Sequence, residues 1–73
     1  MNIRLCKTFS GETFAVYEVK QTRSQLGCPT WMVLCGRVDK RPIWRTLITR
    51  RRGRPYFWID GTRFCLDDFK KAA

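Results

Sequence analysis

Histidine is absent from the 73-residue chain, which removes the side chain that most often serves as a general base near neutral pH. Without it, neither a Ser–His nor a Cys–His nucleophilic couple can form. The two serines, Ser10 and Ser24, lie in turn-like segments, and the sequence offers no general base to activate either hydroxyl. The adjacent Asp67 and Asp68 are explained more simply as the acidic start of a helix than as a shared proton or metal site. The sequence therefore predicts that the protein is not an enzyme.

Long apolar runs are also missing. No stretch of about 18 apolar residues occurs, so we expect no membrane-spanning helix. The start, MNIRLCKTFSGE, has no apolar segment of the secretory type, so we expect a reducing compartment. The closest two of the four cysteines, Cys28 and Cys35, are separated by six residues, and no histidine can complete a ligand set. We therefore expect reduced, half-buried thiols at Cys6, Cys28, Cys35 and Cys65, with no metal and no cofactor.

Acidic residues are few. Six Asp and Glu stand against fifteen Lys and Arg, which gives a net charge of +9. Eight of the cations fall between residues 37 and 54, where Asp39 is the only acid. A charge of this size favours phosphates, acidic membranes or acidic proteins as partners. The competing interpretation is a basic face that is only solvated.

Two segments of the chain read as strands. Residues 13–20 carry β-branched and aromatic side chains that alternate, with Ala15, Tyr17 and Val19 on one side and Phe14 and Val16 on the other. A helix starting after Ser10 is the alternative for this segment. Residues 31–38 form a short continuous apolar run, which is typical of a strand at the centre of a sheet or buried on both faces.

Residues 43–52 fit either a helix or a strand. Ile43, Trp44, Leu47, Ile48 and Arg51 lie at helical spacing, and the Gly-Arg-Pro that follows resembles a helix stop. However, the segment is rich in β-branched and aromatic residues, which are poor helix formers and good strand formers. We favour a strand, so that residues 51–54 become a hairpin tip in which Gly53 supplies a positive φ.

An Asp60-Gly61 pair lies between the strand-like segments YFWI and TRFCL. This arrangement predicts a β-hairpin with a type I′ turn, because both central residues of that turn need a positive φ. Within the first strand, Tyr56 and Trp58 share one face while Phe57 and Ile59 share the other, and one of the two faces must belong to the core.

The final segment, LDDFKKAA, reads as a short helix with acids near its start and lysines near its end. With the strands above, it predicts an α+β, mostly β fold. We expect a small twisted antiparallel sheet of four or five strands, a meander with an Asp-Gly hairpin, and a C-terminal helix. A chain of this length has room for one domain, residues 1–73, with a thin core built largely from its ten aromatic residues.

The basic tip and its neighbouring rings form the candidate binding site. Arginine forks contact phosphates and carboxylates, and aromatic rings stack on bases, which is the combination that RNA and single-strand binders use. Arginine and aromatic residues are also enriched where proteins bind one another. A small basic DNA- or RNA-binding domain and a protein-binding module therefore remain as alternatives. The candidate partner-binding residues are Arg50, Arg51, Arg52, Arg54, Arg45 and Trp44.

The start MNIRLCKTFSGETF, the tip ITRRRGRP and the ending YFWIDGTRFCLDDF together resemble the small transcription regulators of Xanthomonas-infecting phages. The resemblance spans the whole chain. It implies a protein that binds the N-terminal region of the β′ subunit of bacterial RNA polymerase in the cytoplasm of the infected host. It further implies that the protein hinders sigma-dependent initiation and promotes readthrough of terminators. We expect the protein to act as a monomer, with nucleic acid as a candidate second partner.

Overall fold

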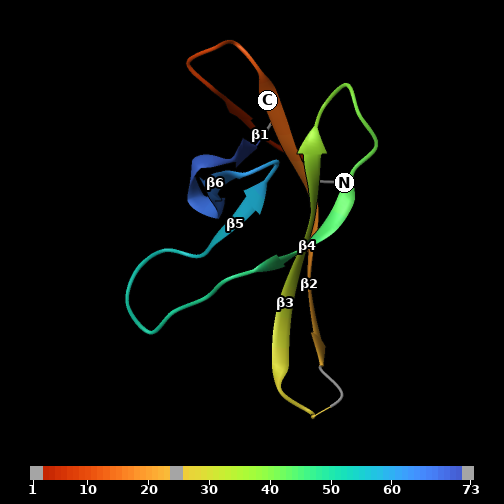
Figure 1. Cartoon of the computed structure of the whole chain (residues 1–73), viewed down its shortest axis with the longest axis vertical. Helices are drawn as coiled ribbons and strands as arrows, with labels where there is room; N and C mark the ends of the chain where they lie inside the picture. The colour runs from red at the N-terminus through yellow and green to blue at the C-terminus, as the bar shows by residue number, and fades with distance from the viewer. Residues whose placement is uncertain (1–2, 24–25, 72–73) are drawn as a thin grey trace.

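A computed structural model describes residues 3–23 and 26–71 as a mostly β domain (Figure 1). An antiparallel five-stranded sheet has the order β4-β3-β2-β1-β7, and β5 and β6 form a separate hairpin. No α-helix occurs among the described residues; one 3-10 turn, η1, precedes β7. The elements are β1 Arg4–Lys7, β2 Thr13–Arg23, β3 Pro29–Arg37, β4 Ile43–Leu47, β5 Tyr56–Ile59, β6 Thr62–Cys65, η1 Leu66–Asp68 and β7 Lys70–Lys71.

Strand β2 confirms the first predicted strand, extends it to Arg23 and corrects its alternation. The register with β3 shifts between Val16 and Glu18, so Tyr17 sits in a β-bulge. Because of the extra residue, Val19 pairs with Val33 and lies on the same face as Val16, not on the face of Ala15 as the simple alternation predicted.

Strand β3 confirms the second predicted strand and occupies an interior position of the sheet. Its second half is largely buried, but its first half is not, and Trp31 is 39% exposed. The expectation of a strand buried on both faces is therefore wrong for this half. The reason is that β2 and β3 extend together beyond the part of the sheet that the β5–β6 hairpin covers (Figure 1).

Residues 43–47 form a strand, β4, which decides between the two predicted alternatives. The strand pairs with β3 from Ile43 to Leu47, and the chain then leaves the sheet. Ile48 and Tyr56 exchange two backbone hydrogen bonds, of 2.7 Å and 3.0 Å, and so close the loop between them.

The predicted Asp-Gly hairpin is confirmed. Ile59 pairs with Thr62, which leaves a two-residue turn, and both turn residues have positive φ: 50° at Asp60 and 80° at Gly61. These signs are those of a type I′ turn. Strand alternation then directs Phe57 into the core, where it is fully buried, and leaves Trp58 48% exposed.

The predicted C-terminal helix is wrong, and with it the α part of the predicted α+β class. Only Leu66–Asp68 form a helical turn, of the 3-10 type. Phe69 is buried in the core, and the lysines that follow pair with β1 as strand β7. Tertiary packing overrides the local pattern, because the free edge of β1 needs backbone partners that a helix could not give. The final two alanines of the predicted helix lie outside the described residues.

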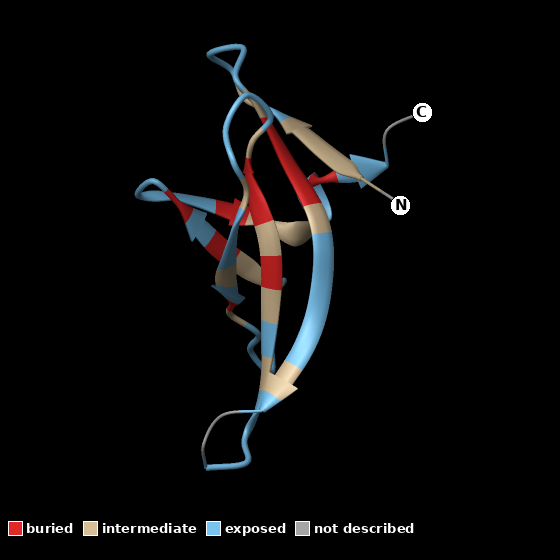
Figure 2. Ribbon diagram, turned by 90° about the vertical axis from the view of Figure 1, so that its right-hand side faces the viewer, coloured by how far each residue is buried: buried red, intermediate tan, exposed pale blue. Residues whose placement is uncertain are grey.

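The core lies between the five-stranded sheet and the β5–β6 hairpin (Figure 2). Four phenylalanines dominate it, and their rings contact one another in pairs. Burying rings of this size supplies a large share of the apolar area that a small domain can remove from water. The buried set is Phe14, Val16, Val33, Cys35, Leu47, Phe57, Ile59, Phe64 and Phe69.

Candidate functional site

Residues 49–55, here called the basic loop, connect β4 to β5 and project from the rest of the domain (Figure 1). Its arginines, Arg50, Arg51, Arg52 and Arg54, are all exposed. Among the described residues, only Arg54 of this set contacts a carboxylate, with its Nε 3.9 Å from Asp67 Oδ2. The loop therefore presents positive charge that the rest of the fold leaves largely uncompensated.

The backbone of the basic loop explains why its arginines point into water. Gly53 has a φ of +104°, which side-chain-bearing residues rarely adopt, so glycine permits the bend of the chain there. Pro55 cannot donate a backbone hydrogen bond and stands just before β5. The predicted positive φ at Gly53 is thus confirmed, and the arginines lie on a loop as expected. The predicted hairpin is wrong, because β4 and β5 belong to different sheets and only the isolated Ile48–Tyr56 bridge joins the two sides of the loop.

An aromatic face adjoins the basic loop on the outer side of the β5–β6 hairpin; it consists of Tyr56, Trp58 and Arg63. Trp58 is directly opposite Arg63 in the strand register. The guanidinium carbons of Arg50 and Arg63 lie 5.9 Å and 5.5 Å from the centre of the Tyr56 ring, so both fall within cation–π range. Tyr56 therefore links the loop to the hairpin.

Arg45, a predicted site residue, lies apart from the basic loop. Its side chain extends toward the Asp-Gly turn, and one of its terminal nitrogens is 3.8 Å from the Asp60 carboxylate. The side chain is only 26% exposed, and its Nε–H is buried with no hydrogen-bond partner in the described structure. Arg45 is therefore held inside the fold.

Trp44, the other predicted residue of β4, lies on the opposite face of the sheet because neighbouring strand residues alternate. Its exposed ring is covered in part by Lys20 of β2, whose Nζ is 4.2 Å from the ring centre. This distance permits a cation–π contact. Trp44 and the basic loop thus belong to different surfaces.

The structure therefore brings together four of the six predicted site residues, those of the basic loop, and separates Arg45 and Trp44 from them. Sequence reasoning missed Arg63 and Lys20. The two-residue Asp-Gly turn could have placed Arg63, because it fixes Trp58 opposite position 63. Lys20 could not have been placed in this way, since its approach to Trp44 depends on three strands and a bulge.

Cys6 and Cys65 are half-buried as expected, but Cys35 is buried and Cys28 is exposed. The thiols of Cys6 and Cys35 offer little reactive thiolate. Burial raises the pKa of the Cys35 thiol to about 11, although the charge of Arg45 and a hydrogen bond from it act in the opposite direction. Burial also raises the pKa of Cys6, and the Asp68 carboxylate adds to this rise. Within residues 3–23 and 26–71, no cluster of three or more Cys, Asp or Glu side chains is placed to hold a metal ion.

No helix in the described part of the chain has the length and apolar character needed to cross a membrane. Comparisons of the chain with protein-family models, with curated proteins and with solved structures gave no match.

Proposed function

We propose that the protein is a phage-type transcription regulator that binds bacterial RNA polymerase, and that the basic loop is its main contact. The observation that carries the proposal is the exposure of four loop arginines with a single carboxylate contact, that of Arg54 with Asp67, among the described residues. Arginine clusters of this kind fit an acidic protein surface, because each guanidinium can form two parallel hydrogen bonds with one carboxylate.

The aromatic face supports a protein partner. Tyrosine, tryptophan and arginine are the residue types that contribute most of the binding energy where two proteins meet, and this face carries Tyr56, Trp58 and Arg63. Trp58 is 48% exposed, and Tyr56 lies between Arg50 and Arg63. A partner that covers this face would gain apolar area at its centre and ion pairs at its edge.

The resemblance of the sequence to phage transcription regulators supplies the identity of the partner. On this proposal the protein binds, as a monomer, the N-terminal region of the β′ subunit in the cytoplasm of the infected cell. Binding hinders sigma-dependent promoter engagement and promotes terminator readthrough. The net charge of +9 would speed association with an acidic polymerase surface, and added salt would weaken it.

A small DNA- or RNA-binding domain is the second candidate. The observation that favours it is the pair of aromatic side chains beside the basic loop, since bases stack on exposed rings while arginines contact the phosphates. The two candidates differ in what a nuclease removes. A polymerase partner remains bound after nucleic acid is digested, whereas a nucleic-acid-mediated partner is lost.

The test is a pull-down from nuclease-treated bacterial lysate, followed by promoter and terminator assays with purified polymerase. One variant replaces the four loop arginines, Arg50, Arg51, Arg52 and Arg54, with serine. The matched control removes the same amount of charge from exposed positions elsewhere, as Lys7→Ser, Arg23→Ser, Lys70→Ser and Lys71→Ser. Because both variants lose four positive charges, a difference between them shows that the position of the charge matters and not only its amount.

We expect the wild type and the matched control to retain polymerase subunits and to inhibit initiation, and the loop variant to lose both properties. Loss of every partner after nuclease treatment would favour the nucleic-acid candidate. A folded loop variant that inhibits transcription at wild-type strength would remove the basic loop from the site and leave the exposed Trp44 or the half-buried Tyr17 as the better candidates.

A further inference from the structure

A small cavity opens at the corner where β3, β4, the turn between them and the Asp60 turn meet. Its volume is about 180 Å³. Four cationic residues line it, Arg37, Lys40, Arg41 and Arg45, and Asp60 is its one acidic residue. This corner is separate from the basic loop, which lies between β4 and β5.

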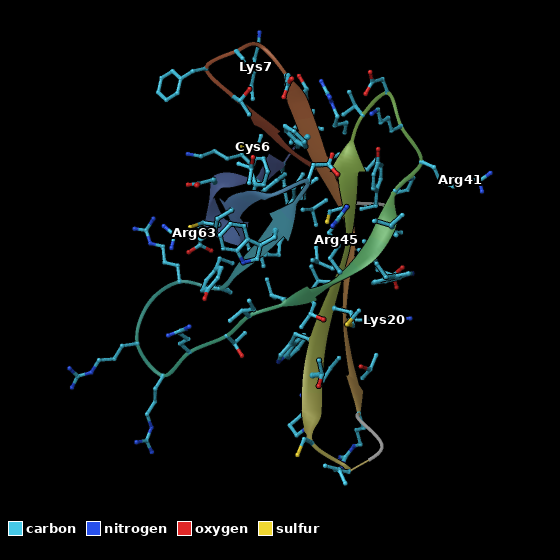
Figure 3. All side chains as sticks on the ribbon, viewed as in Figure 1. Cys6, Lys7, Lys20, Arg41, Arg45 and Arg63 are labelled. Atoms are coloured by element: carbon cyan, nitrogen blue, oxygen red, sulfur yellow. The ribbon has the colours of Figure 1, made fainter. Side chains whose placement is uncertain are left out.

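The four cations are not equally available to a ligand. Arg37 is held by Glu12, at 2.9 Å, and by Asp39, at 4.0 Å. The side chain of Arg41 extends away from the body, whereas that of Arg45 lies within it (Figure 3). Within the described residues, Lys40 and Arg41 make no ion pair. Arg45 is therefore the inner donor, and the other two cations add positive charge at the rim.

Arg45 has unused hydrogen-bonding capacity. Its guanidinium interacts with the Cys35 thiol, but its Nε–H is buried and has no acceptor, and its one ion pair, with Asp60, has a separation of 3.8 Å. A buried N–H group without an acceptor is costly, and nearly all such groups in folded proteins find one. The terminal nitrogens of the guanidinium, of which one is only weakly paired with Asp60, can still bind one oxyanion through two parallel bonds.

We propose that this cavity binds an oxyanion of the phosphate class, with Arg45 as the anchoring residue and Asp60 as its internal competitor. In the unliganded protein Asp60 partly neutralises Arg45, and a phosphate group takes over the guanidinium when it enters. The cavity has room for a small anion, since its volume is many times the ~10 to 15 Å³ that a cavity needs to hold one water. It suits it in charge as well, because the lining is cationic.

The phosphate can belong to a free anion or to the backbone of a nucleic acid, and the chemistry at Arg45 is the same for both. The proposal does not depend on polymerase binding, because none of the lining residues comes from the basic loop. If the polymerase proposal for the basic loop fails, phosphate binding in the Arg45 cavity can still be tested, and the reverse also holds.

The test is an NMR titration of the full chain with inorganic phosphate at constant ionic strength. We expect saturable shifts of the Arg45 Nε–H signal and of the backbone amides of Lys40 and Asp60. Arg45→Gln should abolish these shifts, whereas the serine variant of the basic loop should keep them. Titration with a short single-stranded oligonucleotide then distinguishes a free phosphate anion from a nucleic-acid backbone as the ligand. If the backbone is the ligand, the oligonucleotide shifts the same signals at a lower concentration than inorganic phosphate does.

Asp60→Asn provides a gain-of-binding test that does not depend on the stability of an Arg45 variant. Asparagine keeps the size of the side chain and tolerates positive φ, so the turn is preserved. Removal of the competing carboxylate should tighten phosphate binding by about two- to fivefold, the equivalent of one surface ion pair. An unchanged affinity in this variant would overturn the proposal. Linear shifts without saturation, or shifts restricted to the basic loop, would overturn it as well.

Discussion

The ring centres of Phe14 in β2 and Phe64 in β6 are 4.6 Å apart. Among the described residues, this is the closest ring pair between the five-stranded sheet and the β5–β6 hairpin. Phe64 also contacts Phe57 and Phe69, at 6.3 Å and 5.9 Å. One side chain thus joins both sheets and the segment after η1. The cohesion of the domain depends on this ring.

Phe64→Ala should destabilise the domain by about 3 to 5 kcal/mol, because it leaves a cavity at the contact between the two sheets. Small domains have few kcal/mol in reserve, so a large part of the population should be unfolded at 25 °C. Urea unfolding followed by circular dichroism measures the loss. Trp58→Ala is the matched control, since it removes a ring of the same hairpin from the solvent side and should cost about 0.5 kcal/mol. Equal losses in the two variants would contradict the assigned faces.

Gly61→Val should destabilise the protein by roughly 1 to 3 kcal/mol. A β-branched side chain would be forced to the φ of 80° that the turn requires. No atom crowds the position, so the cost would come from the backbone alone. Thermal unfolding measures it, and Asp60→Asn at the neighbouring positive φ should stay within about 0.5 kcal/mol of wild type. A neutral Gly61→Val would mean that the turn is of another type.

The free energy of unfolding should fall as pH rises from about 9 to about 11. The Cys35 thiol has its pKa raised from 9.0 to about 11 in the folded protein, so in this interval the unfolded chain loses a proton that the folded chain keeps. The stabilisation is fully present below pH 9. Cys35→Ala should remove this part of the pH dependence, which urea titrations of both proteins at pH 8 and pH 11 would measure. Parallel curves for the two proteins would contradict the raised pKa.

Lys20 and Trp44 should show a coupling energy of about 0.5 to 1 kcal/mol, as expected for a partly exposed cation–π contact. A double-mutant cycle with Lys20→Met and Trp44→Leu measures it, since Met keeps most of the apolar stem and removes the charge. The same cycle with Lys7→Met, which alters an exposed lysine of β1, is the control and should give no coupling. A coupling near zero in the first cycle would show that the contact does not persist in solution.

Local signals predicted much of this fold. The Asp60-Gly61 turn and the burial of Phe57 follow from turn chemistry and two-residue alternation, which need no knowledge of the rest of the chain. The strand at β4 also follows, from its β-branched and aromatic residues. What these features share is that neighbouring residues determine them.

The errors arose where distant segments decide the structure. Residues 66–71 carry a helical charge pattern, but the core takes Phe69 and β1 takes the lysines after it. The bulge at Tyr17, which reverses the face of Val19, depends on the register with β3. Likewise, the six predicted site residues do not form one site, because strand alternation directs Trp44 and Arg45 of β4 to opposite faces of the sheet.

The pairing of β1 with β7 sets the order in which this protein can be built. Arg4 is opposite Lys71, so the sheet joins two segments separated by nearly the whole length of the chain. Contacts over such separations form late, because the loop they close is long. The outer edge of β1 therefore stays unpaired until β7 is in place, while β1, β2, β3 and β4 can pair with one another without it. A partly folded chain in which residues 70 and 71 have not yet docked would expose an open sheet edge.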